Sequence, residues 1–467
     1  MMIKDCFSGV YNEFVPDKRL RARLEKTMSN LIHKGTSVIN KLVDSHTEKI
    51  GIYRMLSNDR FDYSDLLDAS HKKCADAIDV KHVLAIQDTT EFNYQGIKKK
   101  LGKEDSDIGP TGINTIAGYF CHPVLVMNPQ SNCIYGISST IFYNRVWDKK
   151  NKNERKYSQQ PIEEKESFRW IKSGEETKNN IDSSVEITLI GDRESDIYEE
   201  FCVVPNDRLN LLVRSRCDRN LANGGGKLYA TLESEPVSGS YEIQLASNKK
   251  RAARKAKIEI KYCQVSIAAP SNYKGETKEV TLWGIEARES EETKPKDDEG
   301  ILWRLLTTHE VKSVEQAIEC VSWYKKRWFI EELFRVIKTK GFQIESSQLA
   351  SGLKLKKLLA MTLEAALHVM KLKLALTQDE CLATTVFSEE EEQEFIEVLQ
   401  TKVEGATLKQ KNPYPKKTLA WAAWTIARVA GWTGYSSHGP PGYITIKEGY
   451  DRFHLQLEGY LLFKNKS

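Results

Sequence analysis

The chain has 467 residues, which is more than one hydrophobic core usually supports and predicts about three domains at roughly 150 residues each. Hydrophobic residues make up 40% and charged residues 29%, as in soluble globular proteins, and no apolar run of about 18 residues is present to cross a membrane. The first residues contain no apolar stretch followed by a small-residue cleavage site, which argues against secretion. Nine scattered cysteines without a C-x-x-C pair favour reduced thiols over a disulfide framework or zinc site. We therefore expect a cytoplasmic protein with no membrane partner.

The net charge of +4 says little about partners, but the basic residues are clustered. Six of the nine residues in Lys249–Lys257 are basic, and a second cluster lies at Lys18–Arg23. Acidic runs are kept apart from them, at Glu289–Glu299 and Glu389–Glu394. Such a distribution suits a protein that binds phosphate groups, and it equally suits solvated helix faces.

The chain begins with a helical region and continues with strands. In residues 1–70, apolar residues recur at helical spacing, as at Leu20, Leu24, Met28 and Leu31. From Lys81 onward, short apolar runs bounded by turn residues predict strands. These runs are Val83–Ile86, Ile116–Met127, Ile134–Ile137, Val185–Ile190 and Asn210–Arg214.

Residues 215–300 contain further strand-like runs between Gly, Ser, Pro and charged turns, which predicts a β-rich insertion. The clearest are Tyr241–Leu245, Ile258–Ile267 and Val280–Ala287. Long helices are predicted from Ser313 to about Lys340 and from Lys354 to about Leu376, with a largely helical remainder. The pattern predicts an α/β protein with helical regions at both ends: residues 1–70, 71–376 and 377–467.

Two acidic residues follow predicted strands in the same way. Asp88 ends the run KHVLAIQD, and Asp192 follows VEITLIG. Carboxylates at the ends of neighbouring strands point into a crevice where hard divalent cations bind oxygen ligands. A single aspartate at such a position is more often a turn residue or a helix cap.

A third acid lies on the helix predicted after Ser313. Tyr324, Arg327, Glu331 and Lys338 are spaced i, i+3, i+7 and i+14, which places them on one stripe, and Arg335 joins them. A separate apolar stripe is formed by Ile330, Leu333, Phe334 and Ile337. An acid flanked by cations suits metal-dependent phosphoryl transfer, in which carboxylates hold two cations and Arg and Lys bind phosphates. An exposed helix with i,i+4 ion pairs would show the same spacing.

These motifs resemble those of the DDE transposases of the insertion-sequence-four group. That group carries a Y-(2)-R-(3)-E-(6)-K motif, which this chain matches at Tyr324, Arg327, Glu331 and Lys338. It also carries Asp-Thr-Thr after its first strand and Asp-Arg-Glu-x-Asp-Ile after its fourth, as at Asp88–Thr90 and Asp192–Ile197 here. The three motifs occur in order and at compatible spacing, which makes the resemblance specific.

The resemblance implies DNA contacts for further residues. Arg214 matches an arginine that contacts phosphate, and Trp303 matches a tryptophan that accommodates a base flipped out of the duplex, although a buried core tryptophan is the alternative. Arg54 lies in a segment that resembles the group's Tyr-Arg segment near transposon-end DNA. For Arg193, a phosphate contact and a structural salt bridge remain equally open.

The group implies a ribonuclease-H-like catalytic core with the β-rich insertion before the helix of Glu331. It also implies a helical N-terminal DNA-binding domain and a helical C-terminal dimerisation domain. Asp88, Asp192 and Glu331 would hold two Mg²⁺ ions, with Mn²⁺ as a substitute. Such a bacterial enzyme, associated with the nucleoid, cuts double-stranded DNA at transposon-end inverted repeats through a hairpin and joins the 3′-OH ends to target DNA as a homodimer.

Two other functions fit the same residues. One is a metal-dependent nuclease that cleaves DNA without joining strands. The other is a catalytically silent, transposase-derived protein that only binds DNA or inhibits transposition. The intact acidic triad argues against the second, and a joined product in a strand-transfer assay would exclude the first.

Overall fold

The computed structural model describes residues 7, 9–97, 101, 105–112, 115–147, 157–245, 253–296, 299–339, 341–377, 381–387, 390–435 and 438–464. The chain is a mixed α/β protein, which confirms the predicted fold class at this level. It divides into two compact units. Unit 1 comprises Met1–Asp79, Thr89–Lys149 and Glu331–Ser467, and unit 2 comprises Val80–Asp88 and Lys150–Ile330.

Unit 1 combines helices from both ends of the chain with a group of antiparallel strands. Its helices are α1 (Lys18–Lys34), α2 (Ile39–Leu42), α3 (His46–Leu56), α4 (Tyr63–Asp76), α10 (Gly352–Ala375), α11 (Glu390–Val403), α12 (Leu419–Val429) and α13 (Tyr443–Lys464). Its strands are β2 (Thr90–Asn93), β3 (Gly109–Thr111), β4 (Ile116–Met127) and β5 (Ile134–Tyr143). Strands β2, β3 and β5 each pair antiparallel with β4.

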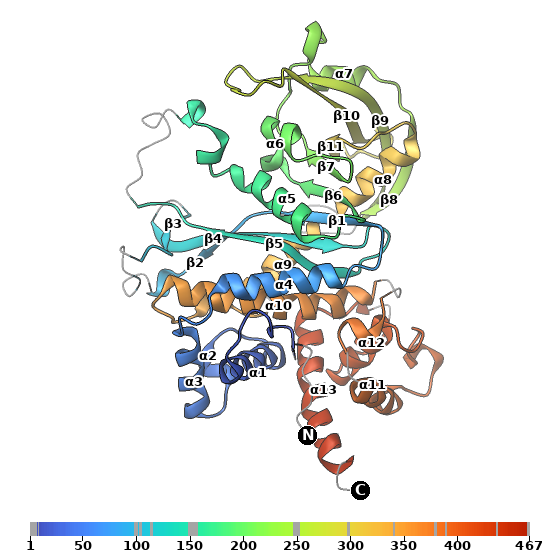
Figure 1. The fold of residues 1–467 in the computed structure, drawn as a ribbon. Coiled ribbons are helices and arrows are strands. Elements are labelled where there is room, and N and C mark those ends of the chain that lie inside the picture. Colours follow the sequence, from blue (N-terminus) through green and yellow to red (C-terminus); the bar gives the residue numbers. More distant parts are fainter. Residues whose placement is uncertain are drawn as a thin grey trace. The chain divides into compact units, whose positions relative to one another are not determined.

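The helix α10 is the centre of unit 1. It runs beside α4, and both helices pack against β5 (Figure 1). The helices α1, α12 and α13 contact α10 as well. Most residues of α10 are buried, including charged ones such as Glu364. Because a helix that is buried on most sides has no water-facing stripe, its charged residues need partners inside the protein.

Local sequence signals explain the first helix. Asp17 caps α1, and its carboxylate accepts hydrogen bonds from the backbone N–H groups of Arg19 and Leu20. The helix ends at Gly35, whose φ of 51° lies in the left-handed region that glycine adopts without strain. The apolar residues predicted at helical spacing are all buried, which confirms the predicted helical face.

Unit 2 is built around a mixed sheet. Its strands are β1 (His82–Gln87), β6 (Glu186–Gly191), β7 (Leu209–Arg214), β8 (Gly239–Leu245), β9 (Arg254–Ala268), β10 (Glu279–Glu289) and β11 (Leu302–Thr307). Its helices are α5 (Phe168–Asn180), α6 (Tyr198–Val203), α7 (Leu228–Ser234) and α8 (Val314–Lys325). A further helix, α9 (Trp328–Lys338), begins in unit 2 and continues into unit 1.

The strand order in unit 2 is β1-β6-β7-β11-β10-β9-β8. The first three strands are parallel, and β6 is buried along nearly its whole length, as expected for a central parallel strand. The remaining strands pair antiparallel, with α7 packed on β9 and β10 (Figure 1). Strands β8, β9 and β10 lie within residues 215–300, where β-rich structure was predicted, and β11 follows them.

In the part of Lys249–Lys257 that the structure describes, acidic residues from a distant segment lie against the basic ones. Residues 249–252 lie outside the described residues. Arg254 pairs with Glu289, and Lys257 pairs with Glu292 at 3.0 Å, so the acidic turn folds back onto the basic strand. This part of the segment is therefore occupied by ion pairs within the insertion.

The expectation of reduced thiols is wrong for one pair. Cys133 and Cys381 form a disulfide with their Cα atoms 5.9 Å apart, a separation that is normal for this bond. The two residues are 248 positions apart in sequence, so their spacing gave no signal of the pairing. Among the described residues, the other six cysteines are free. No helix within the described residues has the length and apolar character needed to cross a membrane.

Candidate active site

The three parallel strands of unit 2 bring two acids and an arginine to one edge of the sheet. Ile86 pairs with Ile190 and Gly191 pairs with Val213, so the same register places Asp88 level with Asp192 and Asp192 level with Arg214. All three positions lie at the carboxyl ends of their strands. Neighbouring strands are about 4.8 Å apart, so these residues start from adjacent points of the sheet edge.

Gly191 allows this edge to be compact. A Cβ atom at Gly191 would lie 2.3 Å from the side chain of Ser195, which follows in the 3-10 helix η4 (Arg193–Ser195). A larger residue would push η4 away from β6. Asp192 caps η4, because its carboxylate accepts a hydrogen bond of 2.7 Å from the backbone N–H of Glu194. The cap fixes the carboxylate at the strand end.

The carboxylate of Asp88, in the first motif, is held by the guanidinium group of Arg327, in the third motif. Arg327 Nη1 donates to Asp88 Oδ2 at 3.0 Å, and the two side chains are only 16% and 18% exposed. A partly buried ion pair of this kind loses much of its stabilisation when one partner is removed, because the other charge is left unpaired. The structure thus joins the first and third sequence motifs within unit 2.

A cluster of cations surrounds Tyr324 beside the aspartates. Burial raises the pKa of the Tyr324 phenol, whereas the nearby Arg327 and Arg214 act to lower it. Burial lowers the pKa of Arg214, which lies near Tyr324 and near the positive charges of Arg193 and Arg327. The guanidinium groups of Arg327 and Arg214 lie near this phenol, and Arg193 adds a third positive charge near Arg214. Such a group of cations next to carboxylates suits a phosphate contact.

A cavity of about 610 Å³ lies in unit 2 next to these residues. Arg193, Arg214 and Trp303 line it, together with Tyr241 and Lys325. The rest of its wall contains one acidic residue, Glu299, and apolar residues that include Ile243, Leu245, Ile258, Leu302 and Val321. An apolar cavity with cations and an aromatic ring on its wall fits a planar ring that carries a phosphate group.

Trp303 contributes to this cavity rather than to the closed core. It is half-buried on β11, and its ring meets Tyr324 edge-on with centroids 5.3 Å apart. Within the described residues Arg193 forms no salt bridge with an acidic side chain. Of the two roles considered for Arg193, the structure therefore does not show the structural salt bridge.

The single helix predicted from Ser313 to about Lys340 is wrong, because the chain forms two helices there. The backbone N–H groups of Lys326 and Arg327 donate to carbonyls three residues earlier, and these tighter turns end α8. Tyr324 therefore lies on α8, Arg327 lies between the helices, and Glu331 is in the first turn of α9. The predicted apolar stripe of α9 is confirmed as buried.

The residues of α9 after Ile330 and the N-terminal Arg54 belong to unit 1. Arg335 pairs with Glu332, its neighbour on α9. Lys338 lies over the ring of Phe92, and its pKa is lowered by burial. Arg54 is exposed in the last turn of α3. Unit 2 thus groups Asp88, Asp192, Arg193, Arg214, Trp303, Tyr324 and Arg327, and unit 1 contains Glu331, Arg335, Lys338 and Arg54.

Within the described residues, no three His, Cys, Asp or Glu side chains are grouped so that they could hold a metal ion. The carboxylates of Asp88 and Asp192 are engaged instead by a guanidinium group and a backbone N–H. Both are oxygen donors of the kind that Mg²⁺ prefers, and they start from adjacent strand ends, so this pair of residues fits such an ion.

Sequence reasoning did not find a buried network behind the aspartates. Glu200 on α6 accepts hydrogen bonds from Gln87 at 3.0 Å and from Ser195 at 2.8 Å. Gln87 directly precedes Asp88, and Ser195 lies three residues after Asp192. Burial raises the pKa of Glu200 to about 8. The contact between Glu200 and Gln87 had no signal in the sequence, because it depends on the parallel pairing of β1 with β6.

Three aromatic or basic residues were also missed. Tyr241 and Lys325 line the cavity, and Trp328 at the start of α9 is 52% exposed. The run Tyr324–Trp328 (YKKRW) mixes cations with aromatic rings, a composition suited to binding nucleic acid. This composition could have identified Lys325 and Trp328 from the sequence. No protein-family model matches the chain.

Proposed function

We propose that the chain is a DDE-type DNA transposase that cuts and joins DNA ends by metal-dependent phosphoryl transfer. The observation that carries this proposal is the common edge of β1, β6 and β7, where Asp88, Asp192 and Arg214 lie level with one another. The arginine-lined cavity beside this edge supports it. A ribonuclease-H-like core, in which carboxylates gather at the ends of parallel strands, is part of the proposal.

Asp88, Asp192 and Glu331 would hold two Mg²⁺ ions. When bound, the ions would supply Lewis-acid activation of a water or 3′-OH and would neutralise charge on the leaving oxygen. The hydrogen bond from Glu194 and the ion pair with Arg327 hold the two aspartates at the strand ends. The side chains of Arg193 and Arg214 would bind the phosphates that flank the reacting bond.

The cavity provides a place for a nucleotide that leaves the duplex. Extruding a base costs a few kcal/mol of stacking, and contact with an aromatic ring restores part of it. Trp303 and Tyr241 would contact the base, while Arg193 and Lys325 would bind its phosphate. Such a bent strand is what the proposed hairpin step requires, in which a freed 3′-OH attacks the opposite strand and displaces the flanking DNA.

Dimerisation through the C-terminal helices is part of the proposal. On α13, Ile444, Leu455 and Leu462 are 57%, 64% and 67% exposed. Positions separated by eleven and seven residues fall on one stripe of a helix with 3.6 residues per turn. An exposed apolar stripe of this kind fits the same helix of a second copy. Leu455→Glu with Leu462→Glu should abolish a dimer on end DNA in light scattering, and an unchanged dimer would refute this contact.

A strand-transfer assay tests the function. Labelled DNA carrying the inverted repeats that flank the gene is incubated with the protein, Mg²⁺ and a target plasmid. A hairpin on denaturing gels together with a joined product supports the transposase. Cleavage without joining would instead identify a nuclease, and specific binding without cleavage would identify a silent DNA-binding protein.

A further inference from the structure

The segment Asp192–Ile197 contains a second aspartate, Asp196, that the proposed metal site does not use. Asp196 directly follows η4, and its side chain is 0% exposed. A carboxylate inside a protein is costly unless it is paired and hydrogen-bonded. The partners of Asp196 therefore indicate what this residue does in unit 2.

Both carboxylate oxygens of Asp196 accept hydrogen bonds from the loop that follows β7. Oδ2 accepts from the backbone N–H of Arg216 at 2.7 Å, and Oδ1 accepts from Nε of Arg219 at 2.9 Å. Nη2 of Arg219 donates to Oδ1 as well, and to the Asp196 backbone carbonyl at 2.8 Å. The Arg219 side chain is 9% exposed, so the ion pair is shielded from water. Asp196 thus joins the loop after β6 to the loop after β7.

These two loops leave adjacent strands at the candidate site. The loop after β6 contains Asp192 and Arg193, and the loop after β7 begins directly after Arg214. Arg193 and Arg214 both line the cavity of unit 2. Burial lowers the pKa of Arg214, and the nearby positive charge of Arg193 lowers it further. The two arginines repel each other, and the contact of Asp196 with Arg219 offsets that repulsion by holding their loops together.

Arg219 is itself held in place by α7. Its backbone carbonyl accepts a hydrogen bond of 3.0 Å from the N–H of Leu228, at the start of that helix. At the other end of the loop, the backbone N–H of Ser215 donates to the carbonyl of Arg304 on β11 at 2.8 Å. The loop after β7 is therefore fixed at two points, and the ion pair fixes the loop after β6 against it.

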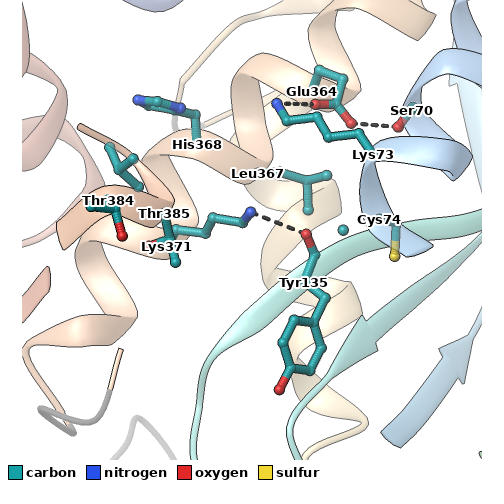
Figure 2. A pocket seen from close by; sticks show the side chains of 12 residues that line it. Ser70, Lys73, Cys74, Tyr135, Glu364, Leu367, His368, Lys371, Thr384 and Thr385 are labelled. Atoms are coloured by element: carbon teal, nitrogen blue, oxygen red, sulfur yellow. Dashed lines mark hydrogen bonds and ion pairs between the residues drawn. The ribbon is translucent and has the colours of Figure 1, made fainter. Parts of the chain in front are cut away.

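A buried acid of the same kind lies in unit 1 and provides a comparison. Glu364 on α10 lies 3.2 Å from the Lys73 ammonium and accepts a hydrogen bond from Ser70, both of which are on α4 (Figure 2). The Glu364 side chain is 8% exposed. This network joins two helices that contain none of the predicted site residues, whereas Asp196 joins two strand ends that each carry an arginine of the cavity wall.

We propose that Asp196 and Arg219 are positioning residues that hold Arg193 and Arg214 together, so that the two arginines bind neighbouring phosphates of one DNA strand. The proposal rests on the proposed function, because it takes DNA phosphates as the ligand of this cavity wall. Asp196 and Arg219 act only through the other two arginines and do not touch the DNA. Without the ion pair, the repelling arginines move apart and no longer contact both phosphates at once.

The salt dependence of DNA binding tests this role, because each phosphate contact contributes about 0.7–0.9 to the slope of log affinity against log salt. End DNA is titrated with the full-length protein in EDTA, so that cleavage does not interfere. Asp196→Asn and Arg219→Gln should each weaken binding and make the slope shallower by about 1, because a phosphate contact is lost. The same change at an exposed aspartate before β7, Asp207→Asn, should leave the slope unchanged.

Two further variants separate positioning from stability. Glu364→Gln removes the comparison acid in unit 1 and should lower the melting temperature without changing the slope. Adding Asp196→Asn to a variant with Arg193→Gln and Arg214→Gln should not change the slope further, because the arginines through which Asp196 acts are already gone.

The outcomes distinguish the positioning role from the proposed function. Unchanged slopes in both Asp196→Asn and Arg219→Gln would overturn the positioning role and leave the proposed function standing. A further change in slope when Asp196→Asn is added to the two arginine variants would overturn it as well. If wild type binds end DNA but does not cut it with Mg²⁺, the proposed function fails, and shallower slopes of the two variants still support the positioning role. If wild type does not bind end DNA, both are wrong.

Discussion

The buried carboxyl group of Glu200 should make unit 2 less stable as the pH rises. Burial raises the pKa of Glu200 from an ordinary value of 4.5 to about 8. Below pH 4.5 the group is protonated in both folded and unfolded chains, and it contributes no pH dependence. Between about 4.5 and 8 the unfolded chain ionises first, so the free energy of unfolding falls as pH rises. At 1.36 kcal/mol per pKa unit, the loss across this window is on the order of 5 kcal/mol.

Glu200→Gln removes the titration and keeps an oxygen that can accept from Gln87 or Ser195. Urea unfolding followed by Trp fluorescence from pH 5 to pH 8 should show a much flatter stability profile for this variant than for wild type. Glu199→Gln, the neighbouring position on α6, is the matched control and should keep the wild-type slope. The reasoning would be refuted if Glu200→Gln and wild type lost stability in parallel over that range.

Three further perturbations have defined outcomes. Arg327→Gln removes the partly buried ion pair with Asp88 and should lower the free energy of unfolding by about 1–3 kcal/mol, which a urea titration measures. Adding Asp88→Asn should recover part of this loss. Trp303→Ala removes a stacking interaction with the extruded base of about 1–3 kcal/mol, so the hairpin yield should fall by roughly 5- to 150-fold while first-strand nicking persists. Equal loss of both products would argue against stacking of the base on Trp303. Burial lowers the pKa of His33 to about 4 and lowers that of His454 well below its ordinary value of 6.5. The contribution of these two histidines to the free energy of unfolding should therefore be complete above about pH 6.5 and should be lost as the pH falls towards 4. Thermal melts of His454→Phe should show a smaller acid loss, and an unchanged loss would contradict this assignment.

Much of the fold followed from local patterns. Helix α1 lies where apolar residues spaced at about 3.6 residues predicted it. Strand β4 lies where a continuous run predicted it, and all of its residues after Ile116 are buried. The break between α8 and α9 could not be predicted from local patterns, because the residues around Lys326 include no Pro or Gly and have a helical composition. Helices α5 and α7 were also not predicted, because their many polar residues leave no clear helical spacing of apolar residues.

Residues of the candidate site could be predicted only where they lie in a sequence motif or directly after a predicted strand. Asp88 and Asp192 were identified by their positions after buried strands, and the parallel register then places them together. Tyr241 lines the cavity, and Glu200 contacts Gln87, through strand pairing and helix packing over long sequence separations, which no local spacing reveals. The pairing of Cys133 with Cys381 has the same origin.

Cleavage of transposon-end DNA by Glu331→Gln and Glu332→Gln tests the central claim most directly. The two residues are neighbours in the first turns of α9, and both changes remove one negative charge, but only Glu331 is assigned to the metal. With Mg²⁺, wild type and Glu332→Gln should yield nicked and hairpin products, while Glu331→Gln and wild type in EDTA should yield neither and still bind the DNA. If Glu331→Gln cuts as well as wild type, the assignment of Glu331 to the acidic triad is wrong and α9 carries only a solvated charge.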